Sequence, residues 1–290
     1  MKYNLDFNFT SSEFKLDNLN NALVLAKMSD LAYKNKDVIT SDLTNNWGAC
    51  QAKFIECGET QCFIALFEEG LILSFRGTEQ NKIADWLTDL DFIKMNGPWG
   101  KKIHRGFYTA LLSVWEKLNQ ALKELQPNTL FPLWITGHSL GGALAVLATV
   151  QFIAEKRRVS GLMTFGQPRV GDKDFTDEFN LHMINAVRFV NNEDIVARIP
   201  KFKYDHVGDK CYFDGQQKAI LNPSIMETWI DSLNEINFRS LKIDKNFVKR
   251  HPNSIEDHAI DRYIACIEKN MPKNFDNKSY SGFLKYINKA

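Results

Sequence analysis

Residues 133–153 constrain this chain of 290 residues more than any other stretch. Three apolar residues, Leu133 to Ile135, predict a buried strand that ends near Thr136. The pentapeptide Gly-His-Ser-Leu-Gly follows at 137–141, and leucines and alanines then recur at helical spacing without a breaker up to Ile153. A strand, a G-x-S-x-G turn and a helix are the context that a nucleophile elbow requires. The stretch therefore predicts a sheet-forming α/β protein with a nucleophilic serine at position 139.

The spacing of the two glycines fits the geometry of such an elbow. A serine at the tip of so tight a turn is expected at positive φ, which strains a residue that carries a Cβ. Its neighbours two positions away must be small because the strand and the helix nearly touch, and these neighbours are Gly137 and Gly141. The N-terminus of the following helix, the partly positive end of its dipole, is predicted to point at Ser139. An oxyanion that forms beside Ser139 would be stabilised there.

Length and charge limit the classes of protein to consider. A chain of 290 residues can form one large α/β domain or two small ones. A formal net charge of +1 gives no reason to expect nucleic acid as a partner. No apolar run approaches the roughly 18 residues of a transmembrane helix, and residues 1–10 lack the apolar region of a Sec signal peptide. We therefore expect a cytoplasmic protein, or one exported by a non-Sec route.

The cysteines argue against a metal cluster or a disulfide framework. There are five of them, at positions 50, 57, 62, 211 and 266, and no C-x-x-C pair occurs. Packed or free thiols are the expectation, which favours a reducing compartment. No motif implies a metal ion or another cofactor.

Hydrophobic periodicity predicts strands that alternate with helices along most of the chain. Helices are expected from a cap at Asp17 to about Tyr33, over 104–126 and over 172–181, and strands at 54–55, 62–67, 71–75, 130–135, 160–165 and 186–190. Residues 62–75 are typical of a hairpin, with its turn at 68–70. The alternation over 130–190 favours a mostly parallel sheet with crossover helices.

Two backbone donors are expected to bind the oxyanion. In folds with this elbow, one donor is the residue after the nucleophile, and the other lies in a loop after an early strand. The first is Leu140, and we assign the second to Thr78, which follows the strand at 71–75 within Arg-Gly-Thr. Gly77 would let another backbone come close. The alternative is that Arg-Gly-Thr is only a turn.

A catalytic carboxylate is expected soon after the strand at 186–190, where ligands gather at the carboxyl ends of parallel strands. Asp194 lies there, 194 − 139 = 55 residues after the elbow serine, in the order Ser, Asp, His that this fold uses. Glu193 is the rival, and adjacent side chains point in different directions, so both cannot serve.

Three histidines follow Asp194, at positions 206, 251 and 258. A catalytic histidine must reach the serine with one ring nitrogen and the acid with the other. His206 lies in a loop by composition, and His251 precedes Pro252 in a basic stretch. His258 follows a capping-box-like helix start at 254–257, so it can be held rigidly at a loop–helix junction. We therefore assign the catalytic base to His258.

Several motifs in one fixed order resemble those of the class 3 lipases, which comprise the filamentous-fungal triacylglycerol lipases and their bacterial and plant relatives; feruloyl esterases share their fold. These motifs are Phe-Arg-Gly-Thr at 75–78, Trp-Leu-Thr-Asp-Leu at 86–90, Ile-His-Arg-Gly-Phe at 103–107, the elbow with its helix at 137–145, 164–171, 190–196 with Pro200, 204–208 and 257–263. Together they cover roughly residues 20–270. The resemblance implies one α/β-hydrolase domain over 1–290, with a mostly parallel central sheet flanked by helices. It also assigns the acid to Asp194, and gives His206 a structural position.

In that family the segment after the oxyanion residue is a lid helix. Here it covers residues 79–92, where Ile83, Trp86, Leu87 and Leu90 fall at i, i+3, i+4 and i+7. Such an amphipathic helix could close over an acyl pocket and open at a lipid surface, where Trp86 would insert. The alternative is a fixed surface helix that never moves, because such a helix would show the same periodicity.

Residues 209–250 match the family least, and we treat them as a variable insertion. Asn222-Pro223 is typical of a helix start, and residues 238–250 are basic. The basic stretch either contacts an anionic membrane surface or is a solvated face. Insertions in this region often shape the acyl pocket in the family, so the preferred chain length stays open.

The resemblance implies a serine carboxylic-ester hydrolase that acts through an acyl-enzyme, most simply a lipase that cleaves acylglycerols. A phospholipase A1 and a short-chain, aryl or feruloyl-type esterase would use the same residues. Further alternatives are a non-catalytic scaffold of the same fold and an effector that attacks another cell's membrane. The expected partners are a lipid or ester substrate and, transiently, a membrane or lipid-droplet surface.

Overall fold

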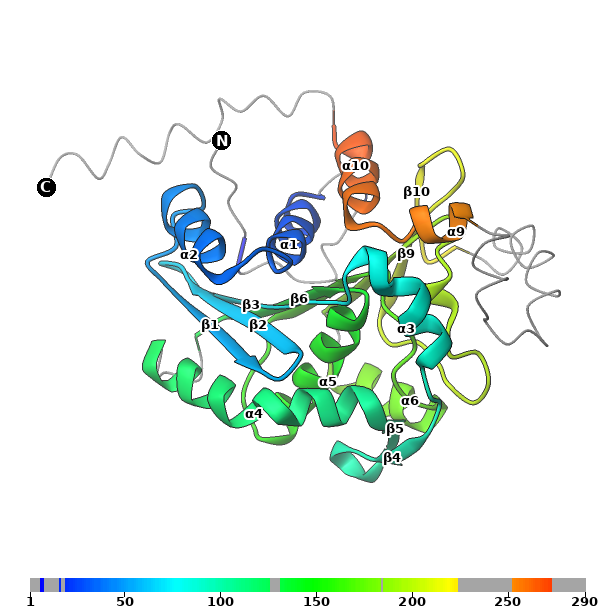
Figure 1. Cartoon of the computed structure of the whole chain (residues 1–290), viewed down its shortest axis with the longest axis horizontal. Helices are drawn as coiled ribbons and strands as arrows, with labels where there is room; N and C mark the ends of the chain where they lie inside the picture. The colour runs from blue at the N-terminus through cyan, green and yellow to red at the C-terminus, as the bar shows by residue number, and fades with distance from the viewer. Residues whose placement is uncertain are drawn as a thin grey trace, which may run out of the picture.

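The computed structural model describes residues 6–7, 16, 19–125, 131–183, 185–223 and 252–272. Four predictions fall outside these residues: the helix cap at Asp17, the helix expected after residue 223, the basic stretch at 238–250, and His251. The described elements form three layers, a central sheet with helices on both faces (Figure 1).

The central sheet has eight strands in the order β1-β2-β3-β6-β7-β8-β9-β10. Their bounds are β1 Gln51–Cys57, β2 Thr60–Leu66, β3 Leu71–Phe75, β6 Leu133–His138, β7 Gly161–Phe165, β8 Ala186–Asn191, β9 Asp209–Phe213 and β10 Ala219–Leu221. The five strands from β3 to β9 pair in parallel, and antiparallel pairs complete both edges. The sheet is thus mostly parallel, as predicted, and the carboxyl ends of its inner strands meet at one edge.

Alternating side chains of the strands build a separate apolar core on each face. Along β3, Leu71, Leu73 and Phe75 join the core beneath α4 (Arg105–Leu125), α5 (Leu140–Ala154) and α6 (Lys173–His182). Ile72 joins the opposite core, beneath α1 (Asn20–Leu31), α2 (Lys36–Asn45) and α10 (Ile260–Asn270). Figure 1 shows these two sets of helices on opposite sides of the sheet. Two buried faces explain why the inner strands are apolar almost throughout.

The smaller elements surround the carboxyl edge of the parallel strands. Helix α3 (Ile83–Asp89) follows β3, the two-stranded ribbon of β4 (Lys94–Asn96) and β5 (Lys102–His104) precedes α4, and α9 (Pro252–Glu256) precedes α10. No helix in the described ranges is long and apolar enough to span a membrane.

The structure departs from the sequence prediction in several places. Helix α2 and strands β4, β5, β9 and β10 were not predicted, and β9 and β10 place residues 209–221 in the central sheet. The helix start predicted at 254–257 is wrong. Helix α9 ends at Glu256, and α10 begins only at Ile260, because the backbone of Ala259 is extended. His258 therefore lies in a turn between two helices.

Candidate active site

The predicted elbow joins β6 to α5. Ser139 has φ 60° and ψ −131°, so the positive φ expected of an elbow serine is confirmed. Its N–H donates to the Phe165 carbonyl at 2.9 Å, and its own carbonyl accepts the Gly142 N–H at 2.9 Å. These bonds to β7 and to the first turn of α5 hold the strained residue in place. The Ser139 side chain is fully buried.

The two elbow glycines are required by close backbone contacts. A Cβ on Gly137 would lie 2.3 Å from the Gly141 carbonyl oxygen, and a Cβ on Gly141 would lie 2.3 Å from the Phe75 carbonyl oxygen. Real Cβ atoms do not approach backbone so closely. The prediction that only small residues fit on either side of Ser139 is confirmed.

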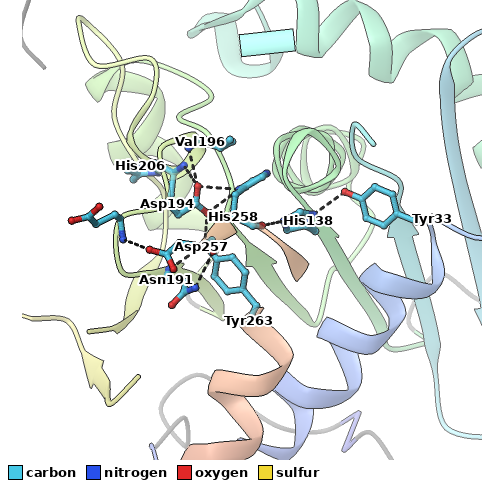
Figure 2. Close-up of polar contacts among 11 residues, drawn as sticks. Tyr33, His138, Asn191, Asp194, Val196, His206, Asp257, His258 and Tyr263 are labelled. Carbon is cyan, nitrogen blue, oxygen red and sulfur yellow. Dashed lines mark hydrogen bonds and ion pairs between the residues drawn. The ribbon is translucent and has the colours of Figure 1, made fainter. Parts of the chain in front are cut away.

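Asp194 and His258 form a buried pair near the carboxyl end of β8 (Figure 2). Nδ1 of His258 lies 2.9 Å from Oδ2 and 3.0 Å from Oδ1 of Asp194. The Val196 N–H donates to Oδ1 at 2.8 Å, and the Tyr263 hydroxyl donates to Oδ2. Burial by itself raises the pKa of Asp194, but the charge and hydrogen bond of His258 and the Tyr263 hydroxyl outweigh it, so this pKa lies below its ordinary value. An ionised Asp194 accepts the Nδ1 proton and leaves Nε2 of His258 with a free lone pair.

Two reactive atoms in this region are buried without a hydrogen-bond partner among the described residues. They are Oγ of Ser139 and Nε2 of His258. Buried polar atoms without partners are uncommon in folded proteins and call for an explanation. The structure thus joins Asp194 to His258 but makes no hydrogen bond between His258 and Ser139.

The Arg-Gly-Thr loop lies directly against the elbow. A Cβ on Gly77 would lie 2.5 Å from the His138 carbonyl oxygen and 3.1 Å from Cβ of Ser139. The close backbone approach expected at Gly77 is therefore confirmed, and Thr78, which is half-buried, is the next residue along the chain. On the other side, Leu140 is the first residue of α5, so its N–H has no carbonyl within the helix to bond.

The rival carboxylate and histidine lie elsewhere. Glu193 is half-buried and bonds through its backbone N–H to the Asp257 carboxylate at 3.2 Å. Nε2 of His206 contacts the Ala197 carbonyl at 2.8 Å, and burial together with the charges of Arg188 and Arg169 lowers the pKa of His206 well below its ordinary value. His206 is thus held neutral against the loop that follows Asp194.

The sequence did not point to five residues that support the pair. Nε2 of His138 lies 2.6 Å from the His258 carbonyl oxygen, and Nδ1 of His138 lies 2.7 Å from the Tyr33 hydroxyl. The Asp257 carboxylate accepts the Asn192 amide at 2.8 Å, and Tyr263 contacts Asp194 as described above. Figure 2 shows that these contacts surround His258 from two sides. The sequence offered one hint for two of them: His138 directly precedes Ser139, and Asp257 directly precedes His258.

Helix α3 packs on the loop that follows Asp194. Ile83 and Leu87 are buried in a cluster with Ile195, Val196 and Ile199. Half-buried Trp86 and Leu90 lie against the same cluster, and the Trp86 ring stacks 6.3 Å from that of Phe107. The predicted apolar face of residues 83–90 therefore faces the protein in this structure.

No group of His, Cys, Asp and Glu side chains suited to a metal ion occurs in the described part of the chain. All five cysteines are free thiols.

The fold and the site define the class of this protein: it is an α/β-hydrolase, with an elbow serine and a buried His–Asp pair at the carboxyl edge of the sheet. The family model described as lipase (class 3) matches residues 72–204. Over these residues the chain is similar to the class 3 lipases.

Individual relatives show the same likeness. A triacylglycerol lipase OBL1 of Arabidopsis thaliana is 26% identical over 246 residues, which cover 64% of this chain and 48% of the relative. A lipase of Rhizomucor miehei is 33% identical over 154 residues, or 50% of this chain and 42% of the relative. The chloroplastic phospholipase A(1) DAD1 of A. thaliana is 27% identical, and the match covers 64% and 45% of the two chains. This chain spans about half the length of the curated relatives it matches.

Solved structures extend the likeness to the fold. The triacylglyceride lipase of R. miehei superposes with a TM-score of 0.59 at 25% identity, over 73% of this chain and 84% of that one. A fungal lipase–inhibitor complex gives a TM-score of 0.58 at 26% identity, over 70% and 84% of the two chains.

Proposed function

We propose that this protein is a serine carboxylic-ester hydrolase whose substrates are acylglycerols or related lipid esters. One observation carries the proposal. The buried Asp194–His258 pair meets the elbow through His138, which directly precedes Ser139, and Nε2 of His258 and Oγ of Ser139 are both buried without hydrogen-bond partners among the described residues. Buried polar atoms without hydrogen-bond partners are expected of a general base and a nucleophile, because these atoms must be available to react.

Each residue then has one role. His258 takes the proton of Ser139 while Oγ attacks the ester carbonyl carbon, and it later returns this proton to the leaving alcohol. Asp194 holds the proton on Nδ1 of His258 and stabilises the imidazolium that forms. Water, deprotonated by His258, then cleaves the acyl-enzyme and releases the acid.

The tetrahedral oxyanion needs donors next to Ser139, and we assign them to the N–H groups of Leu140 and Thr78. Leu140 opens helix α5, where backbone donors and the helix dipole both favour negative charge. The close contact of Gly77 with Ser139 supports the second donor, because it brings the loop of Thr78 to the elbow. Removal of one such donor typically costs about 10²–10³ in rate.

The substrate class rests on the relatives and on α3. The matched relatives are named triacylglycerol lipases, lipases and a phospholipase A(1). Ser139, Asp194 and His258 are fully buried or nearly so, so a segment must move before an ester can reach Ser139. We propose residues 79–92 as that lid, because the face of α3 that packs inward is apolar.

Lid opening would occur at a lipid surface. Phe92 and Ile93 follow α3 and are 52% and 46% exposed, and Phe202 is 78% exposed. The two segments lie side by side, because the Tyr204 hydroxyl donates to the Phe92 carbonyl at 3.2 Å. Exposed apolar side chains gathered in one place are typical of interaction sites. We propose that these residues contact a membrane or lipid-droplet surface during catalysis.

The test is hydrolysis of an ester series from acetate to palmitate, with each ester measured below and above its solubility limit. Ser139→Ala is the test variant, and Ser113→Ala, which removes an exposed hydroxyl on α4, is its matched control. A Ser139-dependent rate jump above the limit for long chains supports a lipase. Turnover of diacyl phospholipids in preference to triacylglycerols would favour a phospholipase A1. Absence of any Ser139-dependent turnover would overturn the enzymatic proposal.

A further inference from the structure

His138 holds the backbone of His258 from the elbow side. Nε2 of His138 lies 2.6 Å from the His258 carbonyl oxygen, and the two rings lie 4.5 Å apart between centroids. His138 is buried and comes directly before Ser139 in the chain. The side chain of His138, a residue of the elbow, thus holds the backbone of His258, the proposed base.

The partners of His138 determine its tautomer. A carbonyl oxygen can only accept, so Nε2 of His138 must carry the hydrogen. Nδ1 then has a free lone pair, which accepts the Tyr33 hydroxyl at 2.7 Å. Burial and the neighbouring His258 lower the pKa of His138 to about 3, so the ring stays neutral while it makes both bonds.

Tyr33 is itself held in place by the loop that carries the proposed oxyanion donor. The Arg76 guanidinium lies 5.7 Å from the centre of the Tyr33 ring and donates to the Ala32 and Lys34 carbonyls. A Cβ on Gly77 would lie 2.4 Å from the Tyr33 hydroxyl, so the glycine makes room for it. Figure 2 shows the resulting line of contacts from Tyr33 through His138 to His258.

We infer that His138 and Tyr33 are positioning residues for His258, and that they couple the oxyanion loop, the elbow and the turn of the catalytic base. This inference rests on the proposed function. His258 is already held on its other side, where the Asp257 carboxylate accepts the Glu193 N–H and the Asn192 amide. With the bond from His138 removed, the His258 carbonyl loses a buried partner and the turn is held on one side only.

The experiment compares Tyr33→Phe, His138→Phe and His138→Gln with the wild type. Tyr108→Phe is the matched control, because Tyr108 also donates one hydroxyl bond, 2.8 Å long, but to Gln151 on the outer helices. Soluble p-nitrophenyl butyrate gives kcat and KM, and a fluorophosphonate titration counts the reactive serines. Long-range ¹H–¹⁵N spectra of histidine side chains report the tautomer of His138 and the environment of His258.

We expect kcat per reactive serine to fall about 10-fold in Tyr33→Phe and about 100-fold in His138→Phe, with KM changed less than twofold, because small misplacements of catalytic groups act on the chemical step. His138→Gln, whose amide can still donate to the carbonyl, should recover at least a tenth of wild-type kcat. Tyr108→Phe should match the wild type. The wild-type spectrum should show the Nε2–H tautomer of His138 from pH 5 to pH 9.

An Nδ1–H tautomer of His138, or wild-type kcat per reactive serine in His138→Phe, would overturn the inference. A loss of reactive serines with unchanged kcat would likewise show a merely structural role. A wild-type protein without ester turnover would contradict the proposed function instead. The spectra would still decide the positioning role, because an unchanged His258 signal in His138→Phe would refute it.

Discussion

The carboxylate of Asp194 lies 2.9 Å from Nδ1 of His258, and neither side chain is more than 1% exposed. No described residue forms a hydrogen bond with the opposite nitrogen, Nε2 of His258. A charged group buried to this extent is stable only when its partners satisfy it, as Val196 and Tyr263 do here. Nδ1 of His258 is thus hydrogen-bonded while Nε2 is left to accept a proton, as a general base requires.

Replacement of Asp194 by Asn is therefore expected to lower kcat by about 10⁴-fold, because an amide favours the wrong tautomer of His258, the proposed base. The measurement is kcat on a soluble ester, normalised by fluorophosphonate titration. Glu193→Gln is the matched control, since it neutralises the adjacent carboxylate, and it should stay within about threefold of the wild type. The reverse ranking of the two variants would assign the acid to Glu193.

The sequence contained enough information to predict the elbow and most strands of the sheet, because these depend on local spacing. Glycines two residues on either side of Ser139 and alternating apolar strands are properties of short segments. The support of His258 is different: His138 and the His258 carbonyl are 120 residues apart, and the acceptor is a backbone atom that any residue carries. Strand β9 was missed because it opens with Asp209 and Lys210 and not with an apolar run, and β10 was missed because three residues offer too little pattern.

Gly141 limits how closely α5 can approach β3. In Gly141→Ala, the new Cβ would lie 2.3 Å from the Phe75 carbonyl oxygen, so the start of α5 must shift. We expect a loss of about 1–3 kcal/mol in the free energy of unfolding, as for other overpacked sites, together with reduced ester turnover. Urea unfolding measures the first. Gly215→Ala is the control, because its nearest contact would be at 3.6 Å, and a similar loss there would contradict the steric explanation.

Acid stability should depend on His138. The pKa of His138 is lowered to about 3 in the folded state, whereas an unfolded histidine titrates near its ordinary pKa of 6.5, so the unfolded state binds more protons between these pH values. The free energy of unfolding therefore falls as pH drops through this window, by up to about 1.4 kcal/mol per pH unit from this group. His138→Gln removes the contribution and should flatten the curve of urea stability between pH 4.5 and pH 6.5. Parallel curves for the two proteins would mean that His138 is protonated in the folded state.

Leu87 offers a test of whether α3 is a lid or a fixed helix. Its side chain is buried against the loop that follows Asp194, so Leu87→Ala weakens the packing that keeps α3 closed. If α3 must open before Ser139 is reached, the variant should hydrolyse a monomeric soluble ester several-fold faster than the wild type, and its rate jump above the solubility limit should shrink. Leu122→Ala is the control, because it deletes a buried leucine of α4 in the core beneath the sheet. A fixed helix makes the opposite prediction: both variants lose stability, and neither turns over the monomeric ester faster.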